Sequence, residues 1–468
     1  MSTDPTRTDP TLSGPSTSHS TGAASSQGTA SSVDVDVAVV GAGGAGLSLV
    51  LALERAARRA GVPAPTIAVI DPVHRSEADR TWCWWTDASP VSSTAAAAPS
   101  GLPALDPLLA RSWARMELID RHGRAREYDL GALRYVMLRS SEFYAAADAA
   151  LDRLSRSSSV PVSPVPGSFV PGGRVLRVTE AVTRVQDGPD VAVVQAGAVE
   201  VRARWVFDSR PATPRRPGST LLLQHFRGWT VRFDDPVLDP ELATLMDFQV
   251  PQPASGVAFA YCLPLDDRRA LVEYTEFSRA RLPSDDYDRA LLDYLRHRWN
   301  VEPGRGVEIE AVEDGVIPMT DAAFAKRVGA RVFRLGTAGG ATRASTGYTF
   351  AAMNRQAEVI ADLLLAGRTP VPPPPYPLRH RWLDAVLLRA LDRGYVQGPD
   401  LFTGLFERNP SDRVVRFLDG LSGPVDELAL MRTTPMRPMV RATIEDAGAR
   451  LRRRLQPRHW LRSVVSRH

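Results

Sequence analysis

The chain has 468 residues, which is enough for two or three domains, and its 44% hydrophobic and 24% charged residues are typical of a globular protein. Its net charge of +4 gives no indication of nucleic-acid binding. The two cysteines, Cys83 and Cys262, are too few for a disulfide framework or a metal cluster, so we expect no metal and a reducing cytoplasm.

Residues 1–32 are rich in Ser, Thr, Gly and Pro and contain no apolar segment, so they predict a disordered leader and not a secretory signal. A Ser-rich plastid transit peptide is the alternative, but Asp4, Asp9 and the scarcity of arginine argue against it. The sequence contains no apolar run of roughly 18 residues, so it predicts no membrane-spanning helix.

A complete strand, turn, helix and strand unit is predicted between residues 35 and 71. The apolar run 37–40 suits a buried parallel strand, and the sequence GAGGAG follows it at 41–46. A helical segment at 47–60 and a second apolar run at 67–70 complete the unit. In this order of elements, a G-x-G-x-x-G motif indicates a dinucleotide site.

Each glycine of the motif is needed for a physical reason. Gly41 permits the tight turn, Gly43 lets backbone N–H groups approach a pyrophosphate, and Gly46 allows the helix to pack closely on the strand. Asp71 ends the second strand, where a carboxylate accepts hydrogen bonds from the adenosine ribose. A Gly-rich turn that only packs would explain the glycines but not Asp71, so we expect a dinucleotide, either FAD or NAD(P).

The next stretch mixes aromatic, low-complexity and regular segments. Residues 80–85 include three tryptophans, which suits a core cluster but places them near the cofactor end of the sheet. We expect an Ala- and Ser-rich loop at 89–101, strands at 113–120 and 126–130, and a helix at 140–154.

Short β runs from 173 to 206 predict a meander that ends in the sequence FDSRP at 207–211. In flavoproteins with two dinucleotide folds, a strand of this kind returns to the cofactor sheet at about this distance. Residues 221–312 then indicate a separate mixed unit of strands with one helix at 285–298.

A further cofactor-type segment is predicted from 332 to 365, with a strand, a Gly-rich turn and a helix that opens at the sequence STGY. A Gly-rich turn before a helix N-terminus forms an anion site, here suited to the phosphate or ribityl chain of a flavin. The residues of this site are Gly336, Gly339, Gly340, Thr346 and Gly347. Two such sites far apart in the sequence favour FAD over NAD.

The Pro-rich segment 369–377 predicts a semi-rigid linker and a domain edge. Beyond it, 382–391 and 413–421 have the pattern of amphipathic helices. From Arg450 onward, arginines alternate with Leu, Trp and Val, which suits the surface of an anionic membrane. A solvated basic tail explains the same pattern, and the sequence leaves this choice open.

Several short sequences, taken in order, resemble one family, the FAD-dependent lycopene cyclases, and more narrowly the bacterial β-cyclases. The resemblance runs from about Val35 to Pro438. Its pieces are GAGGAG, Thr81-Trp82, FDSRP at 207–211, QHFRGW at 224–229, LMDF at 245–248, YCLPL at 261–265, LVEYT at 271–275, GVIPM at 315–319 and GTAGGATRASTGYTF at 336–350.

Two positions depart from the family pattern. Glu273 is followed by Tyr274, where the family often has a second carboxylate, and this leaves one carboxylate in that sequence. Ala344 stands where the family usually has a proline, and Ala can adopt the extended backbone that proline enforces.

The resemblance implies an α/β, two-dinucleotide-fold flavoprotein, with a Rossmann-like FAD domain, an interleaved mixed β-sheet substrate domain and a C-terminal helical region. The predicted parts are an FAD-binding domain (33–85, 131–212 and 313–368), a substrate-binding domain (86–130 and 213–312), and a Pro-rich linker with a helical, basic, membrane-facing region (369–468). The oligomeric state is left open.

The family's reaction is a cyclisation without net redox change: it protonates a terminal double bond of lycopene, lets the cation attack the neighbouring alkene, and removes a proton to close a β-ionone ring. Glu273, in an apolar β pattern, is the best proton donor, because burial keeps a carboxyl group protonated near neutral pH. A buried, hydrogen-bonded structural glutamate is the alternative. Asp247 and Glu313 are acidic candidates of lower rank.

Aromatic faces and the flavin would stabilise the cation. Most buried aromatic residues are only core, but a face is worth roughly 0.5–2 kcal/mol to a cation. The candidates are Trp84, Trp85, Tyr261 and Tyr274. Reduced, anionic FAD would contribute more in a low-dielectric pocket, with NAD(P)H as a reductant that is not consumed in proportion to product. Asp208 and Arg210 either hold the cofactor side of the pocket or brace a turn.

These inferences predict a bacterial lycopene β-cyclase, attached peripherally to the inner face of the cytoplasmic membrane. One rival is a flavin monooxygenase or isoprenoid reductase of the same fold, against which Thr337 argues, because flavin monooxygenases usually have a Gly-Asp pair there. The other rival is a non-catalytic isoprenoid-binding protein. The sequence does not decide whether one or both ends of lycopene are cyclised, or between β and ε rings.

Overall fold

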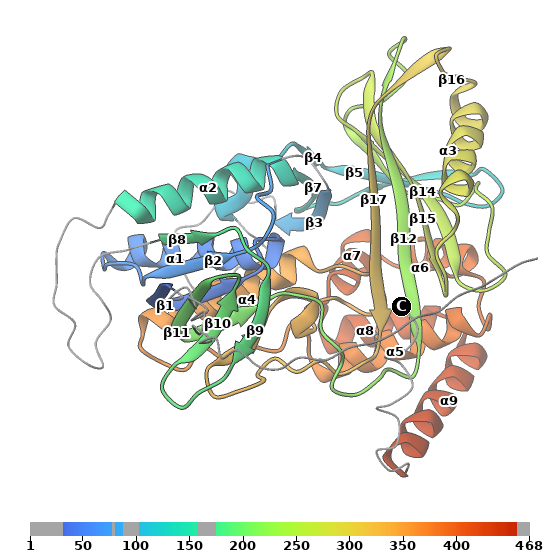
Figure 1. Ribbon diagram of the computed structural model, residues 1–468. Helices are drawn as coiled ribbons and strands as arrows, with labels where there is room; N and C mark the ends of the chain where they lie inside the picture. Colours follow the sequence, from blue (N-terminus) through green and yellow to red (C-terminus); the bar gives the residue numbers. More distant parts are fainter. Residues whose placement is uncertain (1–30, 77–79, 88–102, 157–174, 456–468) are drawn as a thin grey trace, which may run out of the picture.

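The computed structural model describes residues 31–76, 80–87, 103–156 and 175–455, which form three β-sheets and the helices around them (Figure 1). Most of the expected leader, the expected loop at 89–101 and the arginines after residue 455 lie outside the described residues. Ser31 and Ser32, which the sequence assigned to the leader, already belong to the first strand.

The first sheet contains the Gly-rich motif. Its order is β8-β2-β1-β11-β10-β9, and β18 pairs with the end of β11. Strands β8, β2, β1, β11 and β18 run parallel, and β10 runs antiparallel to both of its neighbours, β11 and β9. The bounds are β1 Ser31–Val40, β2 Ile67–Ile70, β8 Val175–Val178, β9 Val182–Gln186, β10 Ala192–Ala196, β11 Val199–Asp208 and β18 Val332–Arg334.

Helices α1 (Gly44–Ala60), α2 (Ser140–Arg156) and α4 (Phe350–Leu365) contribute to a buried cluster on this sheet. Their apolar residues pack with Val37 and Val39 of β1, while Ala38 and Val40 pack into a second cluster on the other face. Burial on both faces explains why this strand is a continuous apolar run, as is usual in parallel sheets.

The second sheet has eight strands in the order β16-β17-β12-β15-β14-β13-β5-β6. The bounds are β5 Arg115–Ile119, β6 Ala125–Asp129, β12 Leu221–Phe233, β13 Leu242–Asp247, β14 Val257–Pro264, β15 Arg269–Ser278, β16 Glu302–Pro303 and β17 Gly306–Thr320. The long strands β12 and β17 stand upright in Figure 1, with α3 (Ser284–Trp299) packed on one face through Tyr287, Leu291 and Leu295.

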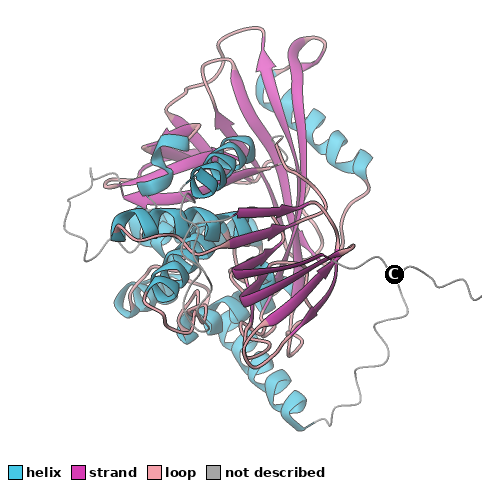
Figure 2. Cartoon of the chain, turned by 60° about the vertical axis from the view of Figure 1, so that its left-hand side comes forward, coloured by secondary structure: helices cyan, strands magenta, loops and turns pink. Residues whose placement is uncertain are grey.

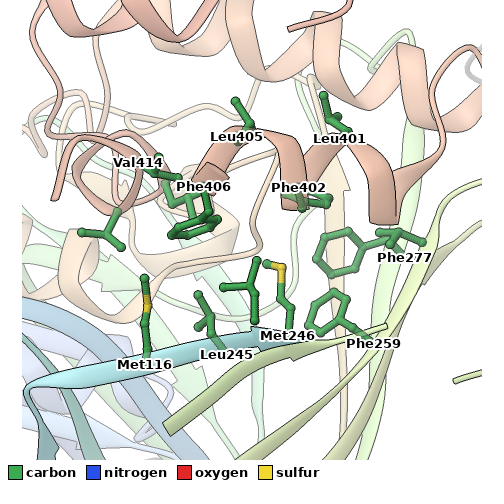
Figure 3. Close-up of a cluster of buried hydrophobic side chains, with 14 of the residues drawn as sticks. Met116, Leu245, Met246, Phe259, Phe277, Leu401, Phe402, Leu405, Phe406 and Val414 are labelled. Atoms are coloured by element: carbon green, nitrogen blue, oxygen red, sulfur yellow. The ribbon is translucent and has the colours of Figure 1, made fainter. Parts of the chain in front are cut away.

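The C-terminal helices pack on the other face of the second sheet. In Figure 3, Phe402 and Phe406 of α6 point towards Leu245, Met246 and Phe259 of the sheet, all within one buried cluster. The bounds are α5 Leu378–Asp392, α6 Gly398–Arg408, α7 Ser411–Leu418, α8 Pro424–Thr433 and α9 Met436–Leu455. None of the helices in the described ranges is both long and apolar enough to cross a membrane.

The third, small sheet has the order β3-β7-β4. Its strands are β3 Thr81–Asp87, β4 Arg111–Trp113 and β7 Leu133–Arg139, and short 3-10 helices occur at Pro103–Leu108 and Gly336–Gly339. Figure 2 shows how the strands gather into sheets with helices on their faces. The arrangement is the predicted α/β class, with a mixed sheet interleaved in the chain and a helical C-terminal region.

Two of the differences from the expected element boundaries concern the site. Helix α4 begins at Phe350 and not at the sequence STGY, because Gly347 has a φ of +72°, which a helix does not allow. Residues 343–349 instead form a tight loop, closed by the backbone hydrogen bond from Arg343 N–H to Tyr348 O (2.9 Å). Strand β17 continues to Thr320, so residues 313–320 belong to the second sheet.

A buried ion pair fastens this loop to the C-terminal helices. Arg343 and Asp384 of α5 are almost fully buried, and Arg343 donates to Asp384 Oδ1 through Nε (3.1 Å) and Nη2 (3.0 Å). The Ser345 hydroxyl donates to the same oxygen (2.7 Å). A buried guanidinium without its carboxylate is costly, so removing one partner should destabilise strongly.

We predict that Asp384→Ala lowers the free energy of unfolding by about 3–5 kcal/mol, measured by urea denaturation. The matched control is Asp286→Ala, which removes a carboxylate from the exposed Arg289–Asp286 pair and should cost only about 0–1 kcal/mol. Equal effects of the two substitutions would contradict the assigned importance of the buried pair.

Candidate active site

One row of residues across four neighbouring strands holds the acidic groups of the site. Tyr261 in β14 is paired with Glu273 in β15, Glu273 with Gly228 in β12, and Gly228 with Glu313 in β17. Residues paired directly on neighbouring strands share a face, so Tyr261, Glu273 and Glu313 point to the same side of the sheet. All three line a cavity of about 410 Å³.

The Gly-rich loops of the first sheet line the same cavity. Chain segments from three parts of the sequence meet here: the start of α1, the end of β11 and the loops before α4. Their lining residues are Gly43, Gly44, Ala45, Ser209, Gly336, Thr337, Gly347 and Thr349. The structure therefore brings the predicted proton donor and both predicted cofactor segments to one cavity.

Glu273 is buried, with 9% of its surface exposed, and its Oε1 accepts a hydrogen bond from the Thr275 hydroxyl (2.5 Å). Burial raises the pKa of Glu273 to about 8, and the nearby Glu313 carboxylate adds to the rise, while the hydroxyl works against it. Glu313 is half-buried, and its Oε2 accepts from the Thr81 hydroxyl (2.9 Å). The Glu273 carboxyl group is thus protonated at neutral pH.

Of the predicted aromatic residues, only Tyr261 lines the cavity. Trp84 is buried in a cluster beside Phe350, and Trp85 packs behind the cavity wall against Tyr135 (4.9 Å between ring centroids). These two tryptophans therefore do not present a face to the cavity. Their Nε1 atoms are buried without a hydrogen-bond partner among the described residues.

Tyr274 lies on the wrong face of β15 for a place in this cavity. Its hydroxyl donates to Glu276 Oε2 (3.0 Å) and its ring packs in the cluster under α3. Side chains alternate between the faces of a strand, so the neighbour of Glu273 must point away from it. The assignment of Tyr274 to the cation site is corrected, and strand alternation alone could have excluded it.

Trp82 and Phe226 are aromatic residues that line the cavity, where Trp84, Trp85 and Tyr274 were expected. Trp82 is stacked on Phe350, with ring centroids 4.6 Å apart. Phe226 fits because Gly315, its partner on β17, has no side chain: a Cβ there would lie 2.0 Å from the Phe226 ring. Both residues belong to short sequences that carry the family resemblance, and this was the sequence signal by which they could have been identified as site residues.

The turn after β1 fits a dinucleotide phosphate. Gly43 precedes α1. Among the described residues, no side chain caps this helix and none lies within 4 Å of a Cβ placed on Gly43, so space for a ligand borders the helix N-terminus. At Gly46, a Cβ would lie 2.0 Å from Gly41 O, which shows how closely turn and helix pack. Asp71 Oδ2 accepts the Ala42 N–H (2.7 Å), so this carboxylate sits against the turn, beside a smaller cavity of about 50 Å³.

The residues of the later Gly-rich segment divide between two cavities. Gly336 and Gly347 line the main cavity, whereas Gly339 and Gly340 border a separate one of about 230 Å³ next to the Pro-rich linker. Thr346 is buried, and its hydroxyl donates to Leu418 O (3.4 Å). The structure therefore does not bring Gly339, Gly340 and Thr346 into the cavity with Glu273.

Asp208 and Arg210 do not line the cavity either. Asp208 is fully buried and accepts from Arg210 Nη2 (2.8 Å) and Arg334 Nη1 (2.9 Å), which braces the ends of β11 and β18. Only Ser209, between them, reaches the cavity. Asp247 is also distant from it, since it accepts from the Tyr294 hydroxyl (3.0 Å) in the region of α3.

Gln224 is a site residue that the sequence analysis did not single out. It lines the cavity, and its Oε1 is buried without a hydrogen-bond partner among the described residues. A Cβ on Gly347 would lie 2.0 Å from this oxygen, so the glycine makes room for it. A buried acceptor left without a partner suits a ligand that donates a hydrogen bond.

The family model described as "Lycopene cyclase protein" matches residues 36–444. No curated protein sequence matches the chain. Among solved structures, p-nitrophenol 4-monooxygenase PnpA from Pseudomonas putida DLL-E4 is 15% identical over 89% of this chain and 98% of that chain, with a TM-score of 0.50.

A geranylgeranyl bacteriochlorophyll reductase-like protein from Thermoplasma acidophilum is 12% identical over 90% of this chain and 99% of that chain, with a TM-score of 0.47. At 15% identity the likeness to p-nitrophenol 4-monooxygenase concerns the fold alone, and it agrees with the predicted fold class. The family match extends over nearly the whole chain. This protein belongs to the lycopene cyclase family.

Proposed function

We propose that this protein is a lycopene β-cyclase, which closes the acyclic ends of lycopene into β-ionone rings, giving γ- and β-carotene, by proton transfer without net redox change. The observation that carries the proposal is a buried carboxyl group, Glu273, in the wall of a partly apolar cavity that the Gly-rich loops also line, and this burial raises its pKa to about 8. Membership of the lycopene cyclase family supports this choice of substrate.

In this mechanism Glu273 donates its proton to a terminal double bond, and the proton lost from the new ring returns to a carboxylate of the site. Leu263, Leu271 and Met353 line the cavity and exclude water from the cation. Tyr261 presents an aromatic ring beside Glu273, and Trp82 presents a second one.

The residues present fit FAD as the cofactor. Gly43 and Gly44 would hold its pyrophosphate at the start of α1, Asp71 its ribose, and Gln224 and Gly347 lie where a second part of the cofactor would enter the cavity. When bound and reduced by NAD(P)H, FAD supplies negative charge near the cation and is not consumed.

The decisive experiment is to express the chain in cells that accumulate lycopene and to analyse the pigments by chromatography and mass spectrometry. Products with the mass of lycopene and shorter-wavelength absorption support cyclisation, and their ratio shows how many ends react. A mass changed by oxygen or hydrogen would support a monooxygenase or reductase instead. Unchanged lycopene with folded, flavin-loaded protein would favour the non-catalytic binder.

We predict that Glu273→Gln lowers cyclisation about 10²–10⁴-fold, as expected for loss of a general acid, without lowering Tm, because no buried charge is left unpaired. The matched control is Glu276→Gln, which changes a buried glutamate on the other face of the same strand and should keep the activity. Retained activity in Glu273→Gln would remove Glu273 from the mechanism.

We also predict an alkaline limit to activity. The proton donor is the protonated form of Glu273, which is complete well below its pKa of about 8 and is lost as the pH rises through that value. The kcat/KM should therefore be flat below about pH 7 and fall about tenfold per unit above about pH 8. A decline that begins near pH 5 would mean that the pKa of the Glu273 carboxyl group is not raised.

We propose further that α8 and α9 lie on an anionic membrane, from which lycopene enters. Figure 1 shows α9 projecting from the molecule. Val425, Ile444 and Leu451 expose more than half of their surface, and an apolar groove of about 320 Å³ runs between α5, α8 and α9. Arg437 and Arg452 are exposed beside these apolar residues, which suits anionic lipid headgroups.

For this surface we predict that Val440→Glu weakens binding to vesicles containing anionic lipid in a flotation assay. Val328→Glu is the matched control, because both valines are 49% exposed but Val328 lies on a loop far along the chain from these helices. Equal binding of the two variants would contradict a docking role for α9, and absence of binding by the parent would contradict membrane association.

A further inference from the structure

The row that contains Glu273 has a gap at its centre. Gly228 lies between Glu273 and Glu313, paired directly with each of them on the strands to either side. A Cβ at Gly228 would lie 3.2 Å from Glu313 Cγ and 3.5 Å from Glu273 Cβ. The two carboxyl-bearing side chains therefore flank one empty position on the same face of the sheet.

The second carboxylate of the row comes from another strand. The sequence neighbour of Glu273, Tyr274, points away from the cavity and takes no part in the row. Glu313 comes from a strand two positions away in the sheet and still lines the same cavity as Glu273.

We propose that Glu273 and Glu313 hold one proton between them across Gly228, with Glu273 as the acid and Glu313 as an ionised positioning residue that keeps the proton on Glu273. This rests on the proposed function. During the reaction the Glu273 O–H bond breaks and a C–H bond forms on the alkene. A ring C–H bond then breaks, and its proton returns to the pair, so no electrons are gained or lost.

Two like charges that face one cavity across a single residue repel each other, and the Glu313 carboxylate accordingly adds to the rise in the pKa of Glu273, which favours one retained proton. The partial exposure of Glu313 and its hydrogen bond from the Thr81 hydroxyl favour charge on Glu313. Glu273 is the more buried of the two, so the neutral form is favoured there.

The other titratable groups around the cavity do not supply this charge. Burial raises the pKa of the Cys83 thiol and of the Tyr135, Tyr261 and Tyr348 hydroxyls, so all four stay neutral beyond pH 8. Arg80 is the one cation among the described lining residues. In the proposed pair, Glu313 is therefore the group to which we assign the negative charge.

The first test compares pH profiles of kcat/KM in the flavin-loaded enzyme. Without the neighbouring charge, Glu313→Gln should lower the alkaline limit by about one pH unit, so activity falls about fivefold at pH 8 and changes little at pH 6. Glu313→Asp should restore the parent profile. Asp314→Asn is the matched control, because it removes a carboxylate from the same strand on the opposite face, where Asp314 pairs with Arg227 (2.8 Å).

Gly228→Ala tests the gap without changing any charge. Its methyl group would push the two side chains apart, and Leu271 Cδ1, at 2.9 Å, belongs to a flexible side chain that can move. We expect the alkaline limit to fall in the same direction as for Glu313→Gln. A loss that is equal at every pH in both variants would mean a structural role only and would overturn the pair.

A second readout does not depend on turnover. The infrared band of the protonated carboxyl group, assigned through its loss in Glu273→Gln holoenzyme, should titrate near pH 8 in the parent and lower in Glu313→Gln. That shift supports the pair even if lycopene is unchanged, in which case only the proposed function fails. A band that titrates identically in both proteins overturns the pair, even if the parent cyclises lycopene.

Discussion

The desolvation of one carboxyl group, Glu273, is the constraint on which the site depends. A glutamate in water would be ionised and useless as an acid at neutral pH, and here burial shifts its pKa to about 8. That burial requires the second sheet to be continuous on both sides of β15 and to be covered on the cavity face. The long pairing of β12 with β15 and with β17 keeps the sheet continuous, because each strand fixes the register of the next.

The cavity is closed by parts of the chain that are remote in sequence. The second sheet provides Glu273, the first sheet provides the Gly-rich loops, and helix α5 holds the loop 343–349 in place through the Arg343–Asp384 pair. A buried ion pair adds little to overall stability, but separating its partners leaves a buried charge unpaired, so it holds the loop next to α5. The loop that includes Gly347 is therefore fixed relative to Gln224 by α5, which links the helical region to the cofactor side of the site.

Local patterns predicted local features well. The turn at Gly41, the strands on either side of it and Asp71 follow from short-range sequence rules, and Glu273 stood out as a carboxylate in an apolar strand. The sequence offered both Glu313 and Asp247 as further acidic candidates but could not show which of them joins Glu273. Glu313 is 40 positions from Glu273, and only the pairing with Gly228 brings the two together. Among the tryptophans, composition could not show that Trp82, and not Trp84, would reach the cavity.

Acid chemistry in a buried site has two requirements that oppose each other. A dry, low-dielectric cavity keeps the acid protonated, but it also destabilises the cation that protonation creates, because a lone charge is poorly solvated there. A single buried glutamate meets the first requirement only. The proposed pair would meet both. Glu273 is the more buried group and would keep the proton, while Glu313 is more exposed and would carry the counter-charge. The fold is shared with a monooxygenase, so the proposed proton chemistry rests on this row of residues and not on the fold.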